Sequence, residues 1–234
     1  MSELNPICVA LDTPDIDRAR ALAKALKPHV GHMKIGMEFF YAHGVKGYEA
    51  VAAEGLPIFL DLKLHDIPNT VASGMKSLMR LSPRPAIINL HAAGGMDMMK
   101  AAADAVDRRA KLIAVTILTS LSNEDIWAVG FNAKQKTSAH AASLAKLAKA
   151  TGLDGVVCSP HDLAGIRAAM GPEFLTVVPG IRPAEGASHD QKRIATPRAA
   201  RTAGADILVI GRAITGSPDP VAAAQKILDE LSHG

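Results

Sequence analysis

The chain has 234 residues, of which 48% are apolar, 21% charged and only 3% aromatic, with a formal net charge of +3. Both signs of charge are interspersed, and no basic block is interleaved with aromatic residues, so we expect no nucleic-acid partner. No run approaches the ~20 apolar residues of a membrane-spanning helix, so we expect no membrane partner either. Cys8 and Cys158 lie far apart within apolar runs, which is typical of buried thiols in a cytoplasmic protein.

Short apolar runs alternate with helical patterns from the start of the chain. The first run, 7–11, ends at Asp12 and precedes an amphipathic helix over 15–26 that Pro14 opens. The same pattern predicts strands at 32–36, 57–63, 86–91 and 112–118, with helices at 37–53, at 69–81 and after Gly94-Gly95.

The second half of the chain continues this alternation. The longest connection holds a short helix over 123–129 and a longer one over 137–150, with Thr137 and Ser138 as candidate N-caps. Three more strands are predicted at 155–159, 175–179 and 206–210.

Eight strands that alternate with helices indicate a parallel sheet, because parallel neighbours need a helical crossover. The best match is an α/β fold, a single (β/α)8 TIM barrel domain over 1–234. The alternative is an open doubly wound sheet, which usually carries a glycine-rich turn after its first strand. This chain has Leu11-Asp12-Thr13-Pro14 at that point, which favours the barrel.

The stretch after the third apolar run is the most informative in the chain. It reads Asp61-Leu62-Lys63-Leu64-His65-Asp66, and Asp61 and Lys63 share a face because side chains alternate along a strand. A charged cluster after a strand is often a solvated loop. Here the strand is otherwise apolar, and buried charges are costly unless they are paired, so the pattern favours a reactive site. Asp66 falls on the turn before Pro68.

In a barrel the C-terminal ends of the strands converge on one mouth. The predicted strand ends carry polar groups of both signs: Asp12, Lys34, Asp61, Lys63, Asn89, His91, Thr119 and Ser120. Strands seven and eight are followed by Gly180-Ile181-Arg182 and Gly211-Arg212, where barrels commonly bind phosphate. Gln191 lies in a polar loop over 183–193 that could close on a ligand. No histidine has a partner at metal-ligand spacing, so no metal site is predicted.

The stretch Asp61-Leu62-Lys63-Leu64-His65-Asp66-Ile67-Pro68-Asn69-Thr70 resembles the signature of the orotidine 5'-phosphate decarboxylase family, close to its bacterial branch. The resemblance extends over nearly the whole chain. It includes Val9-Ala10-Leu11-Asp12, Lys34-Ile35-Gly36, Asn89-Leu90-His91-Ala92, Leu118-Thr119-Ser120, Pro179-Gly180-Ile181-Arg182-Pro183, Asp190-Gln191-Lys192-Arg193 and Gly211-Arg212. Leu64 stands where many bacterial relatives carry Phe, and we expect little consequence because the position stays apolar.

The resemblance implies a barrel homodimer that acts on orotidine 5'-phosphate with no metal or organic cofactor. Lys63 would protonate the carbon that loses carbon dioxide, flanked by Asp61 and by Asp66 from the partner subunit, with Lys34 completing the charged array. The implied substrate contacts are Asp12 and Lys34 to the ribose, Asp61 beside the reacting carbon, Thr119 to the pyrimidine, Thr70 from the neighbouring chain, and Arg182, Gln191, Gly211 and Arg212 to the phosphate.

Elementary chemistry agrees with this implication. Loss of carbon dioxide from C6 of a pyrimidine leaves a carbanion that the ring cannot delocalise, and a neighbouring ammonium can both stabilise and protonate it. One rival is a metal-dependent barrel lyase acting on a sugar phosphate, but Lys34 puts a cation where Mg²⁺ would sit. A second rival is a non-catalytic sensor of a phosphorylated ligand, which would not need the charged array.

Overall fold

The computed structural model describes residues 5–183 and 194–232, and within them eight parallel strands close into a barrel in the order β1 to β8. Each strand pairs with its neighbours in the sequence, and β8 pairs with β1. The TIM barrel predicted from the sequence is therefore confirmed. The strands are β1 (Ile7–Ala10), β2 (His32–Gly36), β3 (Ile58–Leu64), β4 (Ile87–His91), β5 (Lys111–Val115), β6 (Gly155–Val157), β7 (Leu175–Val178) and β8 (Ile207–Ile210).

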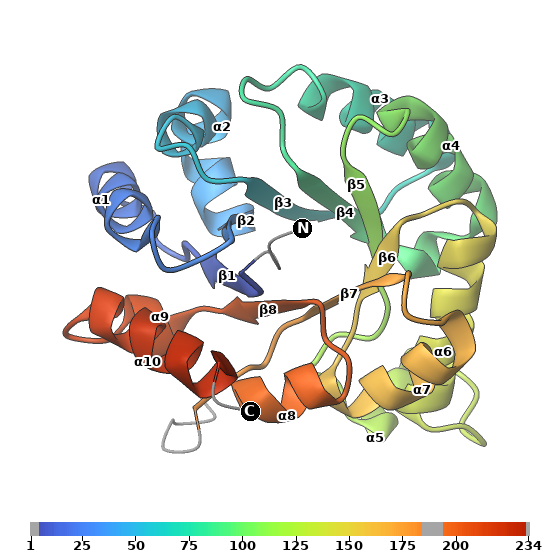
Figure 1. Cartoon of the computed structure of the whole chain (residues 1–234). Helices are drawn as coiled ribbons and strands as arrows, with labels where there is room; N and C mark the ends of the chain where they lie inside the picture. The colour runs from blue at the N-terminus through green and yellow to red at the C-terminus, as the bar shows by residue number, and fades with distance from the viewer. Residues whose placement is uncertain (1–4, 184–193, 233–234) are drawn as a thin grey trace.

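Helices surround the strands on the outside of the barrel (Figure 1). Local sequence explains several of their starts: the Asp15 side chain accepts hydrogen bonds from the first turn of α1, and Pro68 occupies the first turn of α3. The α-helices are α1 (Ile16–Leu26), α2 (Met37–Ala52), α3 (Pro68–Leu78), α4 (Met96–Val106), α5 (Asn123–Ala128), α6 (Thr137–Ala150), α7 (Leu163–Met170), α8 (Pro197–Thr202), α9 (Arg212–Thr215) and α10 (Pro220–Ser232), with short 3-10 turns η1 (Ala92–Gly94) and η2 (Pro160–Asp162). Within the described residues no helix is long and apolar enough to cross a bilayer.

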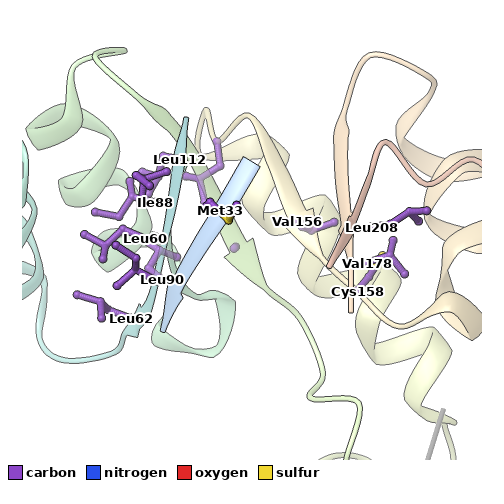
Figure 2. Close-up of a cluster of buried hydrophobic side chains, with 14 of the residues drawn as sticks. Met33, Leu60, Leu62, Ile88, Leu90, Leu112, Val156, Cys158, Val178 and Leu208 are labelled. Atoms are coloured by element: carbon purple, nitrogen blue, oxygen red, sulfur yellow. The ribbon is translucent and has the colours of Figure 1, made fainter. Parts of the chain in front are cut away.

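Alternation along the strands divides the apolar side chains into two layers. The larger layer lies between strands and helices and includes Leu60, Leu62, Ile88 and Leu90 of β3 and β4 (Figure 2). The smaller cluster fills the inside of the barrel and comprises Cys8, Ala10, Phe59, Ile87, Ile113, Val177, Ile207 and Val209. Asp61 and Asn89 follow Phe59 and Ile87 by two residues, so the inward-facing rows become polar toward the mouth.

Several predicted boundaries were wrong. The strand predicted over 112–118 ends at Val115, because the chain turns into a loop at the mouth, where the Thr116 hydroxyl donates to the Val157 carbonyl. Thr137 and Ser138 do not cap α6: Lys136 occupies the N-cap position, and the Asn123 side chain accepts from the Thr137 amide at 2.9 Å. The helix predicted over 37–53 is interrupted at Gly44, whose φ of 57° is not helical.

Candidate active site

Four charged side chains of alternating sign form a connected array at the mouth of the barrel. Asp12 follows β1, Lys34 lies on β2, and Asp61 and Lys63 lie on β3. Lys34 Nζ is 3.2 Å from Asp12 Oδ1 and 3.3 Å from Asp61 Oδ2, and Lys63 Nζ is 2.7 Å from Asp61 Oδ1. Asp61 therefore lies between two ammonium groups, as the spacing on the strand predicts for Lys63.

The centre of this array is buried. Lys34 and Asp61 are each 8% exposed. Burial alone would raise the pKa of the Asp61 carboxyl, but the charges of Lys34 and Lys63 and the hydrogen bonds from Lys63 and Asn89 outweigh it, so the pKa lies below its usual value. Burial would likewise lower the pKa of Lys34, but Asp61 and Asp12 outweigh it and the pKa is raised. Both groups are thus held in their charged forms.

The backbone of β3 leaves regular strand geometry where the array forms. Leu60 pairs with Ile88, and Leu64 pairs with Leu90, so a step of four residues on β3 faces a step of two on β4. Lys63 lies inside this bulge with a φ of 53°, the left-handed region that costs a side-chain-bearing residue roughly 1–2 kcal/mol. The bulge re-aims the lysine, which simple strand alternation did not predict.

Asn89 on β4 contacts both residues of the Asp61–Lys63 pair. Its Oδ1 accepts from the Lys63 amide at 2.8 Å, and its Nδ2 donates to Asp61 Oδ1 at 2.7 Å. The side chain is fully buried. The sequence placed Asn89 at the rim but gave it no role; the available signal was a lone amide within the apolar run Ile87-Ile88-Asn89-Leu90.

A cavity of about 500 Å³ opens beside the array. The structure brings most of the predicted site residues together around it: Asp12, Lys34, Asp61, Lys63, Thr119, Arg182, Gly211 and Arg212. Gly180, with a φ of 76°, Gly211 and the two arginines, which follow β7 and β8, also line it. Gly36 also matters here, because a Cβ at that position would stand 3.0 Å from Lys34 Nζ. The cavity is thus lined by alternating charges from β1 to β3 and by glycines and arginines that follow β7 and β8.

Two predicted residues lie outside this cavity and a third outside the described residues. Asp66 and Thr70 are exposed and line a neighbouring cavity of about 550 Å³, to which Lys63 and Met37 also contribute. The Asp66 carboxylate accepts from the amide of Ile67 at 2.6 Å. Gln191 lies in the segment 184–193, which is not among the described residues.

The histidines near the mouth pack on each other. The rings of His65 and His91 stack with centroids 5.4 Å apart. Burial, followed by the charges of His65 and Lys63, lowers the pKa of His91, which keeps it neutral. Across 5–183 and 194–232, no group of three or more His, Cys, Asp or Glu side chains is arranged to hold a metal ion.

Comparison with known proteins agrees with this geometry. Residues 5–227 match the model of the orotidine 5'-phosphate decarboxylase / HUMPS family. The chain is 53% identical to an orotidine 5'-phosphate decarboxylase of Novosphingobium aromaticivorans over 95% of this chain and 97% of that one, and 49% identical to one of Paramagnetospirillum magneticum over 97% and 99%. A solved orotidine 5'-phosphate decarboxylase of Lactobacillus acidophilus superposes with a TM-score of 0.82 at 38% identity, covering 97% of this chain and 99% of that one. The chain therefore belongs to the orotidine 5'-phosphate decarboxylase / HUMPS family.

Proposed function

We propose that this chain converts orotidine 5'-phosphate to UMP in the cytoplasm, with no metal or organic cofactor, and that Lys63 stabilises and protonates C6. The observation that carries the proposal is the Asp12–Lys34–Asp61–Lys63 array in a barrel mouth that is also lined by two arginines after β7 and β8. Decarboxylases of this name at 45–53% identity support the substrate. Cys8 and Cys158 are buried and form no disulfide within the described chain, which suits a reducing compartment.

The reaction breaks the bond between C6 and its carboxylate carbon. The electron pair stays on C6, and carbon dioxide leaves. The Lys63 ammonium, fixed by Asp61 at 2.7 Å, stabilises this charge and then transfers a proton to C6. The resulting amine regains a proton from solvent. Asp61 carries a second role, because its negative charge next to the substrate carboxylate disfavours the ground state more than the transition state.

The remaining predicted contacts orient the substrate for this step. Asp12 and Lys34 hold ribose hydroxyls, and Thr119 hydrogen-bonds the pyrimidine. Arg182, Gln191, Gly211 and Arg212 take the phosphate, which fits the guanidinium groups and glycine backbone on the cavity wall after β7 and β8. Thr119 is 9% exposed and Arg182 7% exposed, so both are pre-positioned by packing.

The decisive assay follows the ultraviolet absorbance of orotidine 5'-phosphate with purified protein that has been treated with EDTA. We expect full turnover after chelation, because Lys34 and Lys63 supply the positive charge around Asp61. Activity on a sugar phosphate that needs added Mg²⁺, without turnover of orotidine 5'-phosphate, would support the metal-dependent lyase instead. Binding without turnover would support the non-catalytic sensor.

We further propose a homodimer in which Asp66 and Thr70 complete the partner's site. Within one chain both residues are exposed and lie outside the charged cavity, although a carboxylate beside Lys63 suits the chemistry. The surface around them is apolar: Ile67 is 67% exposed and Tyr41 72% exposed. Large exposed apolar side chains grouped in this way are typical of protein interfaces.

Subunit mixing tests this arrangement. Lys63→Ala and Asp66→Ala homodimers should each be almost inactive, because every site in them lacks one group. Unfolding and refolding the two variants together should restore about a quarter of wild-type activity, since half of the dimers are mixed and each of these has one intact site of two. Sedimentation should show the same dimer before and after mixing. No recovery from a properly reassembled dimer would place Asp66 and Lys63 in the same chain's site or remove Asp66 from it.

A further inference from the structure

Asn89 is the one polar side chain described above that touches both members of the Asp61–Lys63 pair without lining the cavity. We propose that Asn89 is a positioning residue for the reaction. It fixes the direction of the Lys63 ammonium toward the substrate by hydrogen-bonding both the Lys63 backbone amide and the Asp61 carboxylate that pairs with the ammonium. This inference rests on the proposed decarboxylase function and deepens it. Its grounds are two hydrogen bonds of 2.8 Å and 2.7 Å made by one fully buried amide.

The first hydrogen bond, from the Lys63 amide to Asn89 Oδ1, takes the place of a backbone hydrogen bond between β3 and β4. Between Leu60 and Leu64 the pairing of β3 with β4 is out of register, so the amide of Lys63 has no ladder acceptor at its place in the bulge. Asn89 Oδ1 supplies that acceptor. A buried backbone amide is costly to leave unpaired, and the left-handed φ of Lys63 is unfavourable without support. Without Asn89, the bulge would relax and carry the lysine away from its present direction.

The second bond fixes the carboxylate. Asp61 Oδ1 receives Asn89 Nδ2 and Lys63 Nζ, each at 2.7 Å, while Oδ2 faces Lys34 at 3.3 Å. Loss of Asn89 removes one of the three groups that fix the orientation of the carboxylate about its Cβ–Cγ bond, and the Lys63 ammonium would follow any rotation of it. Only one orientation of the Asn89 amide satisfies both partners, because the backbone amide needs an acceptor and the carboxylate needs a donor.

The main test replaces Asn89 by leucine, which has nearly the same shape and neither hydrogen bond. We expect kcat to fall on the order of 100-fold, as for a catalytic group displaced by about 1 Å, while UMP affinity stays within about threefold of wild type. Thr176→Val is the matched control. Thr176 is also fully buried and hydrogen-bonded, but to Gly204 and Asp206 near the start of β7, so that variant should lose stability and keep kcat.

Asn89→Asp provides a second measurement if the leucine variant folds poorly. The introduced carboxylate would lie against Asp61, so the two would share a proton, and only the protonated form can donate as the amide does. The groups facing it are Lys34 from β2, Asp61 and Lys63 from β3 and His91 from β4, whereas β5 presents the apolar Ile113 opposite. The kcat of N89D should therefore fall with rising pH across a range in which wild type is constant.

The outcomes separate the two proposals. A folded wild-type chain that does not decarboxylate orotidine 5'-phosphate overturns the proposed function and this inference with it. An active wild type whose N89L variant keeps kcat, with a stability loss like that of T176V, overturns the inference alone. So does an N89D variant whose kcat follows the wild-type pH profile.

Discussion

Replacing Lys63 by alanine is expected to lower kcat by at least about 10⁴-fold, because the loss of a general acid alone typically costs 10²–10⁴ and the loss of electrostatic stabilisation a further 10²–10³. Lys63 Nζ lies 2.7 Å from Asp61 Oδ1, and Lys63 lines the cavity. In the proposed mechanism its contribution grows as charge develops on C6, so the variant should keep UMP affinity within about tenfold of wild type.

Two further proteins make this result interpretable. Lys63→Met keeps the chain length and apolar stem without the charge, and it should be as inactive as the alanine variant. Lys111→Ala is the matched control, since Lys111 also pairs with an aspartate, Asp154, at 2.8 Å, but at the start of β5 and so at the opposite end of the barrel. It should leave kcat unchanged. A Lys63→Ala protein that retains near-native kcat would remove Lys63 from the mechanism.

Replacing Arg212 by alanine is the second large effect. Removing one partner of a desolvated, hydrogen-bonded charge pair costs about 2–5 kcal/mol, so kcat/KM for orotidine 5'-phosphate should fall on the order of 100- to 1,000-fold. Arg212 begins α9 directly after Gly211 and lines the same cavity as the lysines. We expect kcat to fall as well as KM to rise, because binding energy at the phosphate helps to hold the remote ring against Lys63.

The control for this variant is Arg198→Ala. Arg198 is an exposed arginine on α8 that contacts Glu230 of α10, on the outer surface of the barrel. Its loss should leave both kinetic constants unchanged. Steady-state kinetics with orotidine 5'-phosphate and with the phosphate-free nucleoside should show that Arg212→Ala affects only the phosphorylated substrate. An unchanged kcat/KM would remove Arg212 from the site.

Much of the fold could be predicted because a TIM barrel leaves a strong pattern in the sequence. Each strand is buried on both faces, so it reads as a short apolar run, and each run ends in polar residues at the mouth. The ends of the strands were less accurate. In β5 the apolar residues Ile117 and Leu118 continue past the last ladder residue, Val115, and composition alone cannot show where pairing stops. The bounds of α6 were predicted correctly, but its first-turn contact was missed, because the acceptor for the Thr137 amide is the side chain of Asn123, fourteen positions earlier in the chain.

In the candidate site, the pairing of charged residues was predicted, whereas contacts that depend on irregular backbone were not. Strand periodicity predicted that Asp61 and Lys63 are neighbours, and their side chains do pair, although a bulge rather than regular alternation sets the direction of the lysine. It could not reveal the bulge, since a left-handed lysine has no local signature of the kind that glycine gives. The role of Asn89 could not be predicted either, because its two hydrogen-bond partners lie on another strand and one of them is a backbone amide.

The smaller apolar cluster inside the barrel limits the routes by which substrate and product can reach and leave the cavity. Phe59, which lines the cavity, lies within the barrel together with Ile113 and Val177, and with Cys8 they are almost completely shielded from solvent. Their side chains fill the interior of the barrel next to the charged array. In the proposed reaction, carbon dioxide released at C6 would therefore leave through the same mouth of the barrel by which the nucleotide enters. Replacing these apolar side chains by smaller ones would open space inside the barrel and admit water next to the Asp61 carboxylate.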